Sequence, residues 1–117
     1  MTAQAVEPAP TMACTGWAEG PIQEHPVSMG LVVDVAKRTI HGFREWSKQD
    51  GQEAELTITE VKEAILVLRG QTGGQWKNGS ASGFMDRMSG DMTVTVIYDI
   101  GLTVTYRLKC RPAQRMF

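Results

Sequence analysis

The chain has little of what usually identifies an enzyme or a nucleic-acid-binding protein. It contains 2 cysteines and 2 histidines, and its 12 Lys and Arg residues nearly balance its 13 Asp and Glu residues. The basic residues are scattered rather than clustered, so we expect no nucleic-acid partner. No apolar run approaches the roughly 18 residues of a membrane-spanning helix, so we expect no transmembrane segment.

Recognisable catalytic and cofactor motifs are also missing. The segment Gly79-Ser80-Ala81-Ser82-Gly83 carries Ala where a nucleophile elbow has its serine, and the Gly-rich segment 70–74 lacks the Lys-Ser/Thr of a phosphate-binding loop. Met85 and Met92 are expected on opposite sides of their sheet, which speaks against a shared Cu(I) site. We therefore predict no catalytic residue, no metal and no cofactor.

Two cysteines lie near the two ends of the chain, Cys14 and Cys110. An even number of cysteines bracketing a small domain predicts a disulfide and an oxidising compartment. Closing so long a loop stabilises a protein by about 4–5 kcal/mol in the chain-entropy model. The alternative is a pair of buried free thiols in a cytosolic protein.

The first residues are rich in Ala and Pro, which do not build a core. We predict a flexible N-terminal segment over residues 1–11, followed by a single β domain over 12–117. The segment is typical of the region just after an export cleavage site, with Met1 as an initiator residue. We therefore expect a periplasmic or secreted protein whose signal peptide is missing from the printed sequence.

A period of two in residues 92–110 is the clearest structural pattern. Apolar residues alternate with polar or β-branched ones in two runs, Met92, Val94, Val96 and Tyr98, then Leu102, Val104, Tyr106, Leu108 and Cys110. This pattern predicts two half-buried strands joined at Asp99-Ile100-Gly101. Pairing Tyr98 with Leu102 places the apolar residues on one face and the threonines on the other.

Two more hairpins are predicted upstream. In the first, Met29, Leu31, Val33 and Val35 share a face, Asp34 introduces a turn over 35–38, and residues 39–45 return as the partner strand. In the second, Ser82, Phe84 and Asp86 are expected opposite Val96, Val94 and Met92, across the loop Met88-Ser89-Gly90.

Residues 56–68 fit either two short strands hinged at Lys62-Glu63 or one short helix around 57–69, and we favour the strands. Residues 48–52 and 71–79 are predicted linkers. The whole is then a mostly β fold, an antiparallel meander of about eight short strands that forms a small barrel or a two-sheet sandwich. In a barrel, the Cys14 strand would pair with the Cys110 strand, and a disulfide would pin the seam.

Three motifs are set around the predicted turns and cysteines: Cys14-Thr15-Gly16, the segment 83–90 (Gly83-Phe84-Met85-Asp86-Arg87-Met88-Ser89-Gly90) and the ending from Tyr106 through Cys110 to Phe117. They resemble a set of small exported bacterial hypothetical proteins with an early Cys-x-Gly, a Gly-x-x-Asp-Arg-x-x-Gly hairpin and a Tyr-x-Leu-x-Cys ending. The resemblance spans most of the ordered chain and implies export and a shared fold. We know of no assigned activity in that set, so no functional residue carries over.

Two side chains are candidate ligand contacts, His41 and Trp76. His41 lies on a predicted strand whose inward face the sequence does not fix. Beside Asp34 or Asp86 it would be a candidate general base, although a lone His without a placed nucleophile is more often structural. Trp76, in the Gly-rich loop, would contact a small apolar or sugar-like ligand if that loop rims a barrel mouth.

The three tryptophans, Trp17, Trp46 and Trp76, either line such a cavity or plug the barrel ends.

Our first hypothesis is a non-enzymatic exported β-domain that binds a small molecule or an envelope partner. The alternative is a structural or assembly protein acting through a sheet edge or the C-terminal tail, and an enzyme with an unrecognised site is the least favoured. An enclosed cavity above roughly 300 Å³ would favour the first hypothesis, and a filled core with an exposed apolar patch the second. The sequence specifies neither the ligand nor the oligomeric state.

Overall fold

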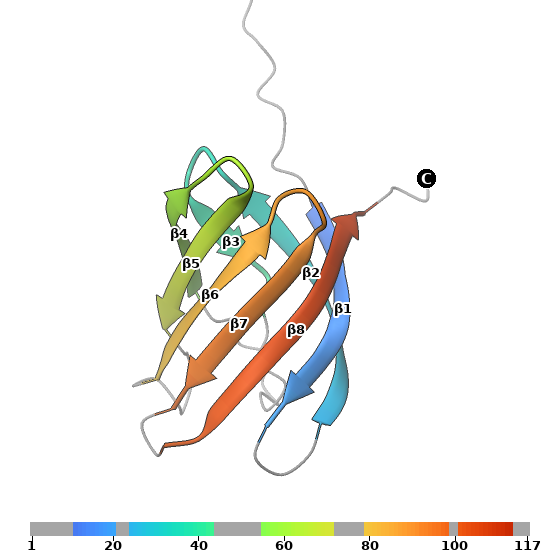
Figure 1. Cartoon of the computed structure of the whole chain (residues 1–117), viewed down its shortest axis with the longest axis vertical. Helices are drawn as coiled ribbons and strands as arrows, with labels where there is room; N and C mark the ends of the chain where they lie inside the picture. The colour runs from blue at the N-terminus through green and yellow to red at the C-terminus, as the bar shows by residue number, and fades with distance from the viewer. Residues whose placement is uncertain (1–10, 21–23, 44–54, 72–78, 99–100, 114–117) are drawn as a thin grey trace, which may run out of the picture.

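The computed structural model describes residues 11–20, 24–43, 55–71, 79–98 and 101–113. Eight antiparallel strands follow one another around a closed barrel, and the last strand pairs with the first (Figure 1). They are β1 (Thr11–Glu19), β2 (Glu24–Asp34), β3 (Thr39–His41), β4 (Glu55–Val61), β5 (Ile65–Gln71), β6 (Ser80–Asp86), β7 (Asp91–Ile97) and β8 (Thr103–Pro112). The predicted β meander is confirmed, and of the two expected architectures it is the barrel that forms.

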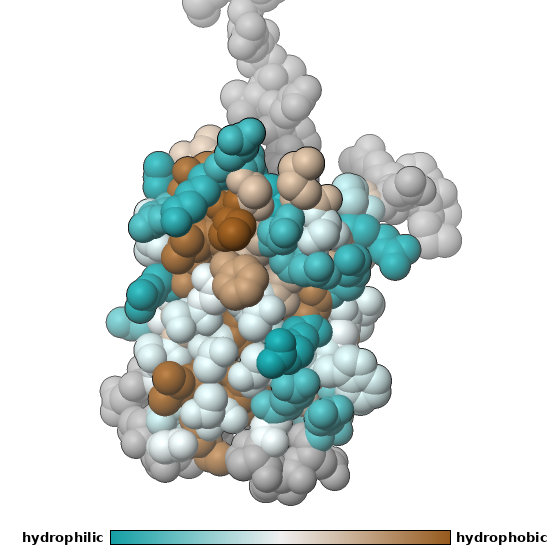
Figure 2. All heavy atoms as spheres, in the orientation of Figure 1, coloured by the Kyte–Doolittle hydropathy of each residue, from teal (hydrophilic) through white to brown (hydrophobic). Residues whose placement is uncertain are grey.

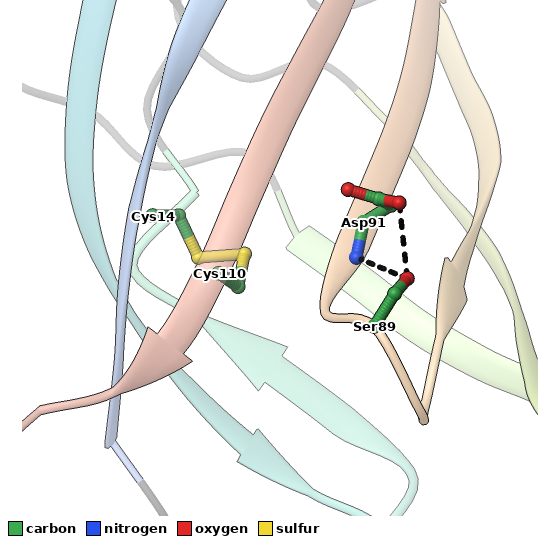
Figure 3. The surroundings of a disulfide bond; sticks show 4 residues. All are labelled: Cys14, Ser89, Asp91 and Cys110. Atoms are coloured by element: carbon green, nitrogen blue, oxygen red, sulfur yellow. Dashed lines mark hydrogen bonds between the residues drawn. A yellow bond between two sulfur atoms is a disulfide. The ribbon is translucent and has the colours of Figure 1, made fainter.

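The barrel closes where β1 lies beside β8. Cys14 stands directly opposite Cys110 in this ladder, with the two Cα atoms 4.0 Å apart, and a disulfide joins them (Figure 3). The predicted disulfide at the seam is therefore confirmed. It links residues separated by 96 positions in the sequence, so it fastens the two ends of the meander to each other.

The hairpin of β7 and β8 has the register that the alternating pattern predicts. Val94 lies opposite Tyr106, and Thr95 lies opposite Thr105, with the two hydroxyl oxygens 3.5 Å apart. Gly101 has a φ of 88° at the end of the connecting loop, as expected of the glycine there. The two residues before Gly101 lie outside the described residues.

The predicted register of β6 against β7 is wrong by one residue. Ser82 pairs with Thr95 rather than Val96, and Met85 pairs with Met92. Both methionines consequently face the same side, where they are buried. The prediction that they lie on opposite sides is corrected as well.

The cause of this shift is the length of the turn. Met85 pairs with Met92, so four residues (87–90) connect Asp86 to Asp91, one more than the three-residue loop we expected. Within this loop, the amide of Gly90 donates to the carbonyl of Asp86 at 2.9 Å. The longer loop turns Ala81, Gly83 and Met85 toward the interior. Phe84 then points outward and stays 47% exposed.

Residues 55–71 form two strands, β4 and β5, so the alternative of a short helix around 57–69 is wrong. The turn between them contains the predicted hinge at Lys62-Glu63. Four alternating side chains are buried, Leu56, Ile58, Leu66 and Leu68. The register shifts between Ile58 and Glu60, a β-bulge that lets the strand bend around the barrel. None of the described residues forms a helix long and apolar enough to cross a membrane.

The first hairpin is confirmed, although its second strand is short. Met29, Leu31 and Val33 are buried on one face of β2. In the turn, a carboxylate oxygen of Asp34 accepts the amide of Lys37 at 3.0 Å, the structural role we predicted for it. The partner strand β3 ends at His41, and the predicted extension past residue 43 lies outside the described residues.

Side chains pack the inside of the barrel. Phe43 and Tyr106, both fully buried, meet edge to face with ring centroids 5.0 Å apart. Aliphatic, methionine and cysteine side chains from every strand complete one core cluster around them. An eight-stranded barrel is just wide enough for such filling. The side chains of the described residues thus occupy the interior, where an enclosed ligand cavity was one of the two arrangements we expected.

Candidate functional site

A groove of about 470 Å³ crosses the outer face of the barrel over β7, β8 and β1. Main chain and outward side chains line it: Thr15, Gly16, Trp17, Asp91, Met92, Thr93, Arg107, Leu108 and Lys109. Its volume falls in the range of roughly 300–1,000 Å³ of small-ligand sites. A second outer hollow of about 310 Å³, lined by Thr57, Arg69, Gly70 and Gln71, has no aromatic side chain.

Trp17 is the largest exposed apolar side chain of this groove. Strand residues alternate between the two faces, and in β1 the inward positions are Cys14, Gly16 and Ala18. Trp17 therefore points outward, and 51% of its surface is exposed. It neither lines the interior nor plugs a barrel end, which corrects both expectations for this residue.

The strand pairing places polar side chains beside Trp17. Arg107 of β8 lies directly opposite it, and Thr93 of β7 lies opposite Arg107. One step along the strands, Lys109 lies between Thr15 and Asp91 in the same way. The groove thus has two parallel rows of outward side chains, each running across three neighbouring strands.

Both cations in these rows are paired with carboxylates. The Nε of Arg107 donates to Glu19 at 3.1 Å, and the Nζ of Lys109 donates to Asp91 at 3.0 Å. Asp91 also accepts from the hydroxyl of Ser89 at 3.0 Å (Figure 3). The bond from Lys109, and then that from Ser89, lowers the pKa of Asp91 below its ordinary value. The carboxylate is therefore ionised and held in place at neutral pH.

Gly16 sets the floor of the groove. A Cβ at this position would collide with the carbonyl oxygen of Arg107, so only glycine lets β1 approach β8 this closely. The close approach keeps Trp17 beside Arg107. The Cys14–Cys110 disulfide joins the same two strands on the inner face of the barrel. The backbone that carries the two rows of side chains is therefore rigid.

The residues predicted as ligand contacts do not meet in this groove. His41 ends the short strand β3, where it pairs with Val32 and is exposed on the outer face. It therefore does not point inward. Trp76, like Trp46, lies outside the described residues.

The condition under which His41 would be a candidate general base, an inward position beside Asp34 or Asp86, is not met. The carboxylate of Asp34 accepts the amide of Lys37, and that of Asp86 accepts the amides of Met88 and Ser89. Both aspartates thus serve turns. Strands β4 and β5 also separate β3 from the strand of Asp86.

Sequence analysis missed Trp17, Arg107 and Thr15 as a group, although a signal for it existed. If Cys14 pairs directly with Cys110 in an antiparallel ladder, residue numbers on the two strands sum to a constant, which places Trp17 opposite Arg107. Alternation from the inward Cys14 then puts Trp17 outside. The disulfide therefore fixes the register of β1 against β8 as well as restraining the chain.

A second outer feature is an apolar patch on β5 and β6, formed by Ile65, Val67 and Phe84. Val67 and Phe84 are direct cross-strand partners, and Ile65 and Phe84 are both exposed. Figure 2 shows apolar side chains gathered over this part of the barrel wall. Two strands of the barrel, β7 and β8, separate the patch from the strand of Trp17.

Comparison of the chain with protein-family models, curated proteins and solved structures gives no match. Within the part of the chain that the structure describes, no three His, Cys, Asp or Glu side chains gather as metal ligands.

Proposed function

We propose that the protein is a non-enzymatic, exported binding domain that holds a small molecule or an envelope partner in the outer groove around Trp17. The observation that carries this proposal is a half-exposed tryptophan in a groove of about 470 Å³, on a ladder fastened by a disulfide. Large aromatic side chains that stay in water on a rigid surface are typical anchors for a ligand.

The proposed binding surface lies outside the barrel because the interior is filled. Tyr106, Phe43 and the aliphatic residues around them fill the interior, so the proposed binding surface lies on the outer wall of the barrel. Binding is favoured over catalysis because the ionic groups of the groove are exposed and paired with each other. Catalytic acids and bases are more often partly desolvated and perturbed by burial.

Export is supported by the disulfide. Disulfides persist in oxidising compartments such as the periplasm or the outside of the cell. The resemblance to small exported bacterial proteins points the same way. We therefore propose the periplasm or the outside of the cell as the location of the binding domain.

The alternative of an assembly protein keeps one specific observation in its favour, the apolar patch around Phe84. In the sequence, this alternative had two bases, a sheet edge and the C-terminal tail. The sheet edge does not apply because each of the eight strands has two neighbours, and the tail past residue 113 lies outside the described residues. If assembly through the patch is the main role, Phe84→Ala rather than Trp17→Ala is the substitution that changes what the protein binds.

A thermal-shift screen with a paired variant tests the proposal. The wild-type protein and Trp17→Ala are screened against the same mixed library of metabolites, oligosaccharides and short peptides. We expect at least one compound to raise the unfolding midpoint of the wild type in proportion to the logarithm of its concentration, with little effect on the variant. A library without such compounds, or hits that stabilise both proteins equally, would overturn the proposal.

A further inference from the structure

We infer that the groove binds a neutral oligosaccharide, with Trp17 as the stacking platform and the two flanking ion pairs as hydrogen-bonding partners for hydroxyl groups. This inference rests on the proposed function and names the ligand class of the same site. Three features of the groove carry it: the exposed indole, the cancelled charges and the extended polar lining.

The exposed indole matches the one apolar surface of a sugar. A pyranose ring presents a face of C–H groups, which packs flat on an aromatic ring, while its hydroxyl groups point outward around the rim. Trp17 offers such a plane with 51% of its surface in water, on a strand hydrogen-bonded on both sides. Little conformational freedom is then lost when a ligand stacks on it.

The charges of the groove cancel. Arg107 is paired with Glu19, and Lys109 is paired with Asp91. A charged ligand would have to compete with one of these pairs, whereas a neutral polyol need not. A carboxylate accepts from hydroxyl groups and a guanidinium or ammonium donates to them, so each pair offers both halves of the hydrogen bonding that two adjacent hydroxyl groups require.

The polar lining is longer than one sugar ring. The row of Trp17 and Arg107 and the row of Thr15 and Lys109 lie two residues apart, about 7 Å along the strands. A monosaccharide stacked on Trp17 would therefore leave the second ion pair unused. An oligosaccharide laid across the strands reaches both rows, and the hydroxyl groups of Thr15 and Thr93 add further partners.

Other ligand classes fit the same residues less well. An anionic polymer needs unpaired cations for its phosphate or sulfate groups, and here both cations have carboxylate partners. A purely apolar molecule favours an enclosed, mostly apolar pocket, whereas this groove is open and its rims are charged. An exposed aromatic ring beside paired charges favours a ligand that is apolar on one face and carries hydroxyl groups at its edge.

A titration followed by NMR tests the inference on the full chain. Cellohexaose, maltohexaose and the hexamer of N-acetylglucosamine are added separately to the ¹⁵N-labelled oxidised protein. We expect at least one to shift the indole resonance of Trp17, identified by its loss in Trp17→Ala, and the amides of Thr15, Thr93 and Arg107. The dissociation constant should change little between about 0.05 and 0.5 M salt, because a neutral ligand is not screened.

Two groove variants and one matched control define the site. Trp17→Ala should weaken binding about tenfold or more, the scale of an aromatic anchor. Arg107→Met should weaken it severalfold while costing little stability, because the ion pair that it removes is exposed. Phe84→Ala is the control: it removes an aromatic side chain of similar exposure, 47%, on β6 and outside the groove. It should bind as the wild type does.

The outcomes separate the ligand class from the function. If no oligosaccharide shifts the Trp17 resonance, or if binding survives in both groove variants, the saccharide inference is overturned. Heparin oligosaccharides are the anionic comparison, and their binding with steep salt dependence, without binding of the neutral sugars, also overturns it. In either case the proposed binding function stands if the screened library yields a compound that Trp17→Ala no longer binds, and falls if it yields none.

Discussion

At the scale of single residues, an exposed aspartate organises the turn between β6 and β7. One carboxylate oxygen of Asp86 accepts the amides of Met88 and Ser89, at 2.8 and 3.0 Å. The bond from Ser89, and then that from Met88, lowers the pKa of Asp86 below its ordinary value. Hydrogen bonds that favour the ionised form have this direction, so the turn is more stable when Asp86 is charged.

The pH dependence of stability follows from this shift. Because the folded-state pKa lies below the unfolded one, about 3.9 for Asp, the contribution of Asp86 is complete above that pH and is lost as the pH falls through the folded value. Asp86→Asn keeps an acceptor oxygen but has no charge to lose. We expect the wild type to have the higher unfolding midpoint near neutral pH, and this advantage to shrink below about pH 4. An advantage that stays constant down to about pH 2.5 would contradict the assignment.

At the scale of elements, the turn between β6 and β7 that Asp86 organises packs against β8. Gly90 has a φ of 84°, and its carbonyl accepts the amide of Cys110 at 2.8 Å. A Cβ on Gly90 would collide with the carbonyl oxygen of Cys110, whereas one on Gly101, also at positive φ, would meet no atom within 4 Å. A side chain at Gly101 would therefore cause backbone strain alone, whereas one at Gly90 would cause the same strain and a steric clash as well.

Substitution of each glycine by alanine measures the two effects. Gly101→Ala should cost about 1–2 kcal/mol, the price of a left-handed backbone for an L-residue. Gly90→Ala should cost about 2–5 kcal/mol, because overpacking adds about 1–3 kcal/mol to the same strain. Urea unfolding of the oxidised proteins gives both values. Equal costs would mean that the turn moves freely away from β8.

A strand's register was predictable from the sequence where its inward positions hold large apolar residues and its outward positions hold polar ones. In β7 and β8, branched and aromatic residues alternate with polar ones over long runs, so register and turn were both correct. In β6 the inward residues include Ala81 and Gly83, while Phe84 is exposed. Gly83 lies opposite the inward Val94, and it is a glycine because a Cβ there would collide with the carbonyl oxygen of Thr93. Such a backbone contact has no sequence pattern, so hydrophobicity pointed to the wrong face.

The candidate site was less predictable than the fold for a related reason. Trp17 and Arg107 are 90 positions apart in the sequence: Trp17 follows the Cys14-Thr15-Gly16 motif and Arg107 is a variable position within the Tyr-x-Leu-x-Cys ending, so no motif contains both. They become neighbours only through closure of the barrel, a tertiary event that local periodicity does not describe. The exposed position of Trp17 also opposes the usual expectation that tryptophan is buried. Only the pairing of Cys14 with Cys110, used as a register, connects the two strands.

At the scale of the whole molecule, the seam between β1 and β8 unites fold and proposed function. It closes the barrel through eight residue pairs, carries the only disulfide among the described residues, and supports the Trp17 row on its outer face. Loss of the seam would therefore remove the proposed binding surface together with the closure of the barrel. Stability and ligand binding are expected to depend on the same covalent bond.

Chemical reduction tests this dependence, because it leaves both sulfur atoms in place and creates no cavity. In the chain-entropy model, a loop closed over a separation of 96 positions contributes about 4–5 kcal/mol at 25 °C. That is most of the stability of a marginal domain. We expect reduction to lower the free energy of unfolding in urea by about this amount and to increase the dependence on urea, since the reduced unfolded chain exposes more surface. The double variant Cys14→Ala/Cys110→Ala, with and without reductant, controls for effects of the reductant itself. A loss below about 1 kcal/mol, small beside the usual 2–4 kcal/mol, would show that the β1–β8 ladder holds the seam without its covalent bond.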